Sequence, residues 1–212
     1  ILVGVAILQA GESGQATLRG FRKINDVIMR MVTILMHFAP YGVFCLLAKL
    51  FTYQGFSAII NLALYFGTMV LVLFLHASVI YSSLFALLTR LNPLTLFKNM
   101  RPALLFAFST ASSNATMPIT LNVARTRVGA HNSIASFTIP LGATVNMDGT
   151  AIMQGVATVF IAQAYGLDLS MAEYLAVIAT ATLASIGTAG VPGVGLITLS
   201  MVLQQVGLPV EG

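Results

Sequence analysis

The chain has little charge and almost no cysteine, and both scarcities limit what it can be. Of its 212 residues only 8% are charged, against about 25% in an ordinary soluble domain, while 58% are hydrophobic. This composition predicts an integral membrane protein. Cys45 is the only cysteine, which excludes a disulfide framework and a cysteine-based zinc site. The sequence has no basic run with interleaved aromatic residues, so the net charge of +4 does not indicate nucleic-acid binding.

Basic residues are also missing from the C-terminal part of the chain. From Val128 to the end there is no Lys or Arg, although Asp148 lies there in the middle of a long apolar stretch. A charged side chain at the centre of a membrane helix costs at least ~2.5–3.5 kcal/mol, and such residues generally face a cavity on an ion or substrate pathway. The predicted counter-charge is therefore a bound cation or a proton. The alternative is a structural Asp that hydrogen-bonds helix ends or pairs with an Arg outside this chain.

The apolar segments and the basic clusters together predict a topology. A membrane-spanning helix needs ~20 mostly apolar residues, and segments 31–51, 56–88 and 134–165 are long enough. Basic residues favour the cytoplasmic side, and nine of the ten fall in three clusters. With all three clusters inside, the first span runs outward, the second returns and the third runs outward again. The clusters are Arg19, Arg22, Lys23 and Arg30; Arg90, Lys98 and Arg101; and Arg125 and Arg127.

Two further apolar stretches are predicted to enter the membrane without crossing it. Pro102–Ala124 lies between two cytoplasmic clusters, so it must enter and return as a re-entrant hairpin with its tip near Ser109–Pro118. Met171–Val206 is interrupted at Gly187–Gly195 and is predicted to form a second hairpin, entering from outside. Two interrupted segments of opposite direction indicate a transporter binding site. The alternatives are a Ser/Thr-rich packing face for the first and a Gly-rich extracellular loop for the second.

The two tips and the Asp148 segment carry groups that suit ions. The serine-rich first tip precedes Pro118, which is predicted to open the next half-helix, and free backbone N–H groups there suit a carboxylate. The glycines of the second tip suit a mobile lid. Asn146–Thr150 offers a carboxylate, an amide oxygen and freed carbonyls, an oxygen set for a hard cation. His37, His76 and Asn61 lie on apolar spans and are interpreted as interhelical hydrogen-bonding residues rather than proton relays.

Three motifs in a fixed order give the chain a family resemblance. They are Ala111–Pro118, Asn146–Thr150 within the run that begins Leu141-Gly142-Ala143-Thr144, and Ala184–Gly193. With them the chain resembles the dicarboxylate/amino acid:cation symporter family, which includes the sodium-coupled glutamate transporters. The resemblance implies an all-α inverted-repeat transporter with two re-entrant helical hairpins and an interrupted helix that carries Asn-Met-Asp-Gly-Thr. It also implies a homotrimer that crosses the cell membrane several times, contacts its lipid and works as an elevator.

The resemblance divides the chain as well. Residues 1–54 would belong to a trimerisation scaffold and residues 55–212 to a moving transport domain. We expect the chain to be a fragment of a larger membrane protein, in which the family's last helix would follow with the Asp and Arg that bind an acidic substrate. The expected parts of the transport domain are a span, 56–89; a first hairpin, 94–128; an interrupted span, 131–165; and a second hairpin, 171–206.

The implied function is symport of Na⁺ with an acidic amino acid, aspartate or glutamate, without an organic cofactor and without enzymatic activity. A C4-dicarboxylate or neutral amino acid symporter is the alternative; an ion channel, or an intramembrane enzyme with Ser113 as nucleophile, is a distant one. Gln154 stands where acidic-substrate members use a Glu for proton coupling, which argues against coupled proton transport. The residues implied for the substrate are Ala111, Ser112, Ser113, Thr150, Gly190 and Val191, and those implied for Na⁺ are Gly142, Thr144, Asn146, Asp148, Ser185, Ile186 and Thr188.

Overall fold

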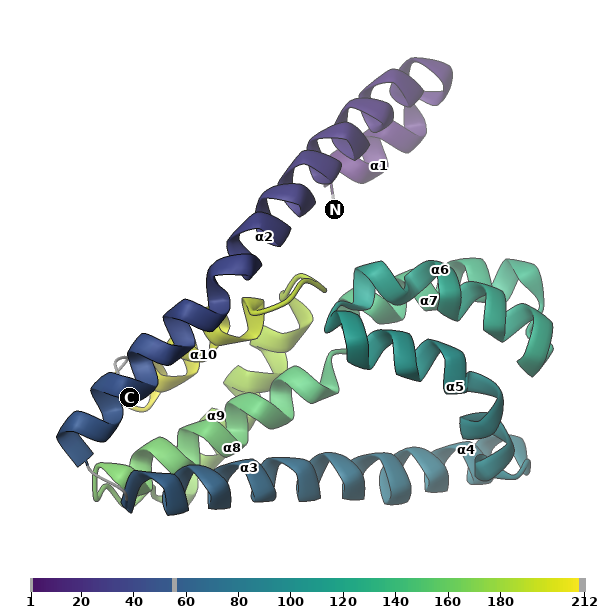
Figure 1. Cartoon of the computed structure of the whole chain (residues 1–212). Helices are drawn as coiled ribbons and strands as arrows, with labels where there is room; N and C mark the ends of the chain where they lie inside the picture. The colour runs from purple at the N-terminus through teal and green to yellow at the C-terminus, as the bar shows by residue number, and fades with distance from the viewer. Residues whose placement is uncertain (1, 55–56, 210–212) are drawn as a thin grey trace. The chain divides into compact units, whose positions relative to one another are not determined.

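A computed structural model describes residues 2–54 and 57–209, and every regular element within these ranges is a helix. The predicted all-helical fold is therefore confirmed for the described residues. In chain order the elements are α1 (Leu2–Gln9), α2 (Gly11–Gln54), α3 (Ser57–Leu75), the π-helix η1 (His76–Tyr81), α4 (Ser82–Thr89), α5 (Pro93–Thr110), α6 (Ser113–Val123), the π-helix η2 (Ala124–Val128), α7 (Asn132–Val145), α8 (Asp148–Ala164), α9 (Met171–Ile186) and α10 (Val194–Gln205) (Figure 1).

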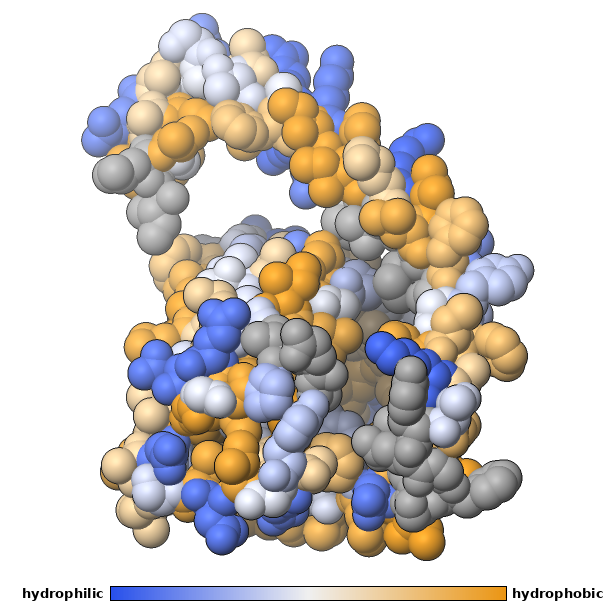
Figure 2. Space-filling model, turned by 90° about the vertical axis from the view of Figure 1, so that its left-hand side faces the viewer, coloured by the Kyte–Doolittle hydropathy of each residue, from blue (hydrophilic) through white to orange (hydrophobic). Residues whose placement is uncertain are grey.

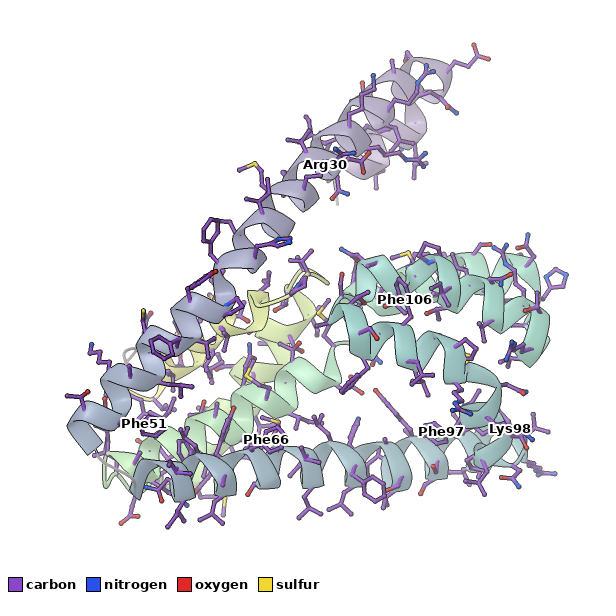
Figure 3. The ribbon with its side chains drawn as sticks, viewed as in Figure 1. Arg30, Phe51, Phe66, Phe97, Lys98 and Phe106 are labelled. Carbon is purple, nitrogen blue, oxygen red and sulfur yellow. The ribbon has the colours of Figure 1, made fainter. Side chains whose placement is uncertain are left out.

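The chain divides into two compact units, Ile1–Asn61 and Leu62–Gly212. In the first unit α1 packs against α2, and the two helices approach closely at Gly14. A Cβ added there would lie 2.1 Å from the carbonyl oxygen of Ile7, so only glycine fits. The 44-residue α2 joins the basic stretch and the predicted span 31–51 in one helix, from which the exposed side chains of Arg30 and Phe51 project (Figure 3). Several side chains of that predicted span lie outside the described residues.

The second unit opens with one continuous helical run through α3, η1 and α4. Its stretch Ile59–Thr89 is, among the described residues, the one helix long and apolar enough to cross a membrane, and none of its apolar window is buried within the chain. Large side chains such as Phe66 are exposed along it (Figure 3). Apolar side chains are also spread over the face drawn in Figure 2. Exposed apolar side chains along the helical run Ile59–Thr89 favour an apolar environment. This agrees with the prediction that residues 56–88 span a membrane.

Two buried hydrophobic clusters of the second unit lie between α8, α9 and α10. One cluster joins α8 to α10 and to Leu208, and a second, smaller cluster joins α9 to α10. These contacts hold α8 in place against the C-terminal helix pair. The buried residues of the first cluster are Ala157, Ile161, Ala162, Leu199, Leu203 and Leu208, and those of the second are Val177, Ala181 and Val202.

Two helix–turn–helix pairs occupy the stretches in which the sequence predicts hairpins. The first pair is α5 and α6, which pack side by side, with α7 against α6 (Figure 1). The second pair is α9 and α10, which both pack against α8. A capping box starts α9: the Ser170 side chain accepts from the backbone N–H of Glu173, while the Glu173 carboxylate accepts from the Ser170 backbone N–H. The turns of both pairs lie toward the gap between α7 and α8 (Figure 1).

Candidate functional site

The break between α7 and α8 places Asp148, the one acidic residue among the described residues that line the site. α7 ends at Val145 and α8 begins at Asp148, while Asn146 and Met147 leave the helical conformation with ψ angles of 78° and 54°. Met147 is buried and anchors the break, and its carbonyl accepts from the N–H groups of Thr150 and Ala151 at 3.0 and 3.2 Å. Asp148 is thus the first residue of a 17-residue helix. The helix dipole favours a negative charge at that position.

Asp148 is held by two side chains from η1. The hydroxyl of Tyr81 donates to its Oδ2 at 2.6 Å, and Nε2 of His76 lies 3.1 Å from the same oxygen. Among the described residues, no Lys or Arg comes within salt-bridge distance of this carboxylate. The interpretation of His76 as an interhelical hydrogen-bonding residue is confirmed. Tyr81 is a contact that the sequence analysis missed.

The first tip is the turn between α5 and α6. Ala111 ends α5 in a left-handed conformation, with φ 47°, and donates its N–H to Ala107 at 2.8 Å. Ser112 is the N-cap of α6, and its hydroxyl oxygen accepts from the N–H of Ala115 at 3.2 Å. The prediction that Pro118 opens this helix is wrong: α6 begins five residues earlier, at Ser113. The hydroxyl cap of Ser112 supplies the start signal, and Pro118 lies inside the helix.

The second tip is the segment between Ile186 and Val194. Gly193 takes φ 80°, a left-handed conformation that glycine adopts without strain, just before α10 begins. At its start, the Thr188 N–H donates to the carbonyl of Ser185 at 3.2 Å. A backbone hydrogen bond at its start and a left-handed glycine at its end therefore define the turn.

The two tips touch each other at Gly190. Its carbonyl oxygen accepts from the hydroxyl of Ser112 at 2.7 Å and from the N–H of Asn114 at 3.2 Å. A Cβ added to Gly190 would lie 3.0 Å from Oδ1 of Asn114 and 3.1 Å from Cβ of Ser113, so the approach is tight. Residues far apart in the sequence thus form one side of the site.

The tips and the break line an open cavity of about 240 Å³. Of the residues implied for substrate, all but Ser112 line it; Ser112 is buried behind Gly190. Of those implied for Na⁺, only Asn146, Asp148 and Thr188 line it, whereas Gly142, Thr144, Ser185 and Ile186 do not. The lining residues are Tyr81, Ala111, Ser113, Asn146, Met147, Asp148, Gly149, Thr150, Thr188, Ala189, Gly190, Val191 and Gly195.

Three helix N-termini open on this cavity. Ser113 is the first residue of α6, Asp148 the first of α8, and Gly195 the second of α10, and all three line it. The positive end of the helix dipole makes each N-terminus favourable for negative charge. Carboxylate, amide and hydroxyl oxygens at the same wall are the ligands that hard cations prefer. The cavity therefore suits an anionic group and a cation together.

A buried polar contact lies next to the cavity. The amide nitrogen of Gln154 donates to Thr198 at 2.6 Å and lies 3.4 Å from the carbonyl of Gly195. Thr198 lies 3.4 Å from the hydroxyl of Thr188 on the second tip. Gln154 is fully buried, and its Oε1 has no hydrogen-bond partner in the described part of the chain. This group ties α8 to α10 below the second tip.

The described residues form a helical protein with an apolar helix long enough to cross a membrane and a candidate site for a small charged ligand. The chain belongs to the sodium:dicarboxylate symporter family, whose model matches residues 1–212. Family membership and the apolar span together place it in a membrane. The resemblance found in the sequence is thereby confirmed.

Curated relatives match the chain over nearly its whole length. It is 40% identical over 212 residues to excitatory amino acid transporter 3 of Mus musculus, covering 100% of this chain and 40% of the relative. It is 38% identical to an excitatory amino acid transporter of Caenorhabditis elegans, covering 100% of this chain and 42% of the relative. It is 40% identical to excitatory amino acid transporter 1 of Rattus norvegicus, covering 98% of this chain and 39% of the relative. The chain thus spans about two fifths of these relatives' length.

Proposed function

We propose that the protein carrying this chain is a secondary symporter that takes up an acidic amino acid, aspartate or glutamate, together with Na⁺. The observation that carries the proposal is the charge of the cavity. Among the described residues that line the cavity, Asp148 contributes a carboxylate and none is a Lys or Arg, and three helix N-termini open on it. A bound acidic substrate would add more negative charge beside Asp148. Cations must then accompany it, and this requirement couples the two fluxes.

The residues divide into two groups by chemistry. Ser113, at the start of α6, and Thr150 each offer a hydroxyl to the substrate, with Gly190 and Val191 covering it from the second tip. Asn146 and Asp148 offer oxygens to Na⁺, joined by Thr188 on the second tip. Gly142, Thr144, Ser185 and Ile186 would contribute to Na⁺ sites through their carbonyls, outside this cavity. The names of the relatives support the acidic substrate.

The proposed architecture assigns residues 1–54 to a trimeric scaffold and 55–212 to a transport domain that moves as an elevator in the plasma or inner membrane. The α5–α6 and α9–α10 pairs would be re-entrant hairpins of an inverted repeat. Helices of 18, 11, 16 and 12 residues support this, since only the longest approaches the ~20 residues that a full crossing needs.

The test is uptake by the purified protein that carries the chain, reconstituted into liposomes. An inward Na⁺ gradient is expected to drive accumulation of radiolabelled L-aspartate, whereas an equal K⁺ gradient is not. L-Glutamate should compete, and succinate or L-alanine should not. Competition by succinate alone would indicate a dicarboxylate symporter, and competition by L-alanine a neutral amino acid carrier. A steady current without any solute would indicate a channel, and would contradict the proposal.

A further inference from the structure

Within the part of the chain that the structure describes, side chains bind the Asp148 carboxylate on one side only. Both of its side-chain hydrogen bonds, from Tyr81 and from His76, reach the same oxygen, Oδ2. The carboxylate is partly exposed, at 29%, and it lines the cavity. A carboxylate can accept about four hydrogen bonds or ligands through its two oxygens. Two donors on Oδ2 fix its rotation and leave Oδ1 for a ligand.

The π-helix explains how both donors reach one oxygen. His76 and Tyr81 are the first and last residues of η1, five positions apart. In an α-helix, with 3.6 residues per turn, positions five apart point in directions about 140° apart. The wider π turn brings them onto one face, and their rings lie 4.7 Å apart in a T-shaped arrangement. Single π turns inside α-helices are frequent at functional sites.

Tyr81 makes the shorter of the two bonds and also lines the cavity. Its phenol is an obligatory donor here because the ionised carboxylate is only an acceptor. Hydrogen bonds to a charged acceptor are short and strong compared with neutral ones. The ring also makes an edge contact with His76, so the two residues that bind Oδ2 contact each other as well.

We infer that Tyr81 is a positioning residue of the cation site: through its hydrogen bond to Oδ2 it orients the Asp148 carboxylate so that Oδ1 meets Na⁺. The inference rests on the proposed function for the identity of the ion. Tyr81 binds the carboxylate assigned to the cation and not a residue assigned to the substrate. Its loss therefore changes the sodium dependence of the protein more than its affinity for the amino acid.

The experiment is Tyr81→Phe in the protein that carries this chain, with Tyr65→Phe as the matched control. Tyr65 lies on α3 within the same helical run, and its ring packs against Phe160 at 5.0 Å, a contact that phenylalanine retains. Tyr81→Phe is expected to raise the Na⁺ concentration for half-maximal uptake about tenfold, the size of one lost hydrogen bond to a charged group. The KM for aspartate at saturating Na⁺ should change less than twofold in both variants.

A second measurement reports Na⁺ binding directly and therefore also applies to variants that do not transport. The rise in melting temperature of the purified protein is recorded against NaCl, with choline chloride at equal ionic strength. The midpoint for Tyr81→Phe should shift about tenfold upward, as expected for loss of a charged hydrogen bond, and that for Tyr65→Phe should not. An unchanged midpoint, or no Na⁺ effect on the wild type, overturns the inference. A shifted midpoint in a protein that takes up no anionic solute supports the inference and contradicts the proposed function.

Discussion

Ser112 donates its hydroxyl to the carbonyl oxygen of Gly190 at 2.7 Å, joining two turns that are 78 residues apart in the chain. The bond is buried, and the same hydroxyl oxygen also caps α6 by accepting from Ala115. One side chain therefore starts a helix and connects the two tips. These two roles can be separated by substitution.

Replacement of Ser112 by glycine and by alanine separates the cap from the contact between tips. Both changes remove the bond to Gly190, but loss of a serine N-cap costs about 1 kcal/mol with alanine and only a few tenths with glycine. Both variants should therefore raise the KM for aspartate, whereas Ser112→Ala should lose more thermal stability than Ser112→Gly because it also lacks a good N-cap. An equal loss of stability in the two variants would show that the Ser112 cap does not stabilise α6. Thermal unfolding and uptake kinetics measure the two effects.

Gly190→Ala tests the closeness of the tips. The new Cβ would lie 3.0 Å from Oδ1 of Asn114 and 3.1 Å from Cβ of Ser113, so the second tip must move away from the first. Aspartate affinity should fall about tenfold or more, the consequence of roughly 1.4 kcal/mol lost at the contact. The control is Gly155→Ala on α8, where a Cβ meets no atom of the described residues within 4 Å. A wild-type KM for Gly190→Ala would contradict the close contact.

The buried pair of Gln154 and Thr198 predicts an asymmetry in stability. Thr198→Val leaves the amide N–H groups of Gln154 buried with one weak 3.4 Å contact, which should destabilise the protein by about 1–3 kcal/mol. Gln154→Met removes the donor and the unpartnered Oε1 together, so it should cost about 1 kcal/mol or less. Denaturation of the two purified variants compares them. A larger loss for Gln154→Met would contradict this account of the pair.

The helical fold and the broken helix follow from local sequence. Apolar segments of sufficient length, separated by basic clusters, predict membrane helices, and polar residues with glycine inside an apolar run predict an interruption. The break at Asn146 and Met147 lies within the predicted run Asn146–Thr150. The helix start at Pro118 was wrong because two start signals compete in that turn, and the Ser112 cap prevails. The sequence alone does not distinguish a proline inside a helix from a proline in the first turn of a helix.

The partners of Asp148 could not be predicted in full, because they depend on tertiary contacts. His76 was recognisable as a polar residue on an apolar span that needs an interhelical partner. Tyr81 lies five positions further on, which an α-helical periodicity places on a different face. Only the π turn of η1 brings the two side chains together at Oδ2. Likewise, the contact of Gly190 with the first tip joins residues that are far apart in the sequence, so the local sequence pattern could not predict it.

Sodium-driven uptake by the Asp148→Asn variant tests the central claim most directly. Asparagine has nearly the same size and can still accept from Tyr81, so the substitution removes the charge and keeps the shape. The account predicts membrane insertion as in the wild type and no Na⁺-dependent uptake of aspartate. Asp168→Asn, in the exposed loop before α9, should transport normally. Wild-type sodium-driven uptake by Asp148→Asn would contradict the role assigned to this carboxylate.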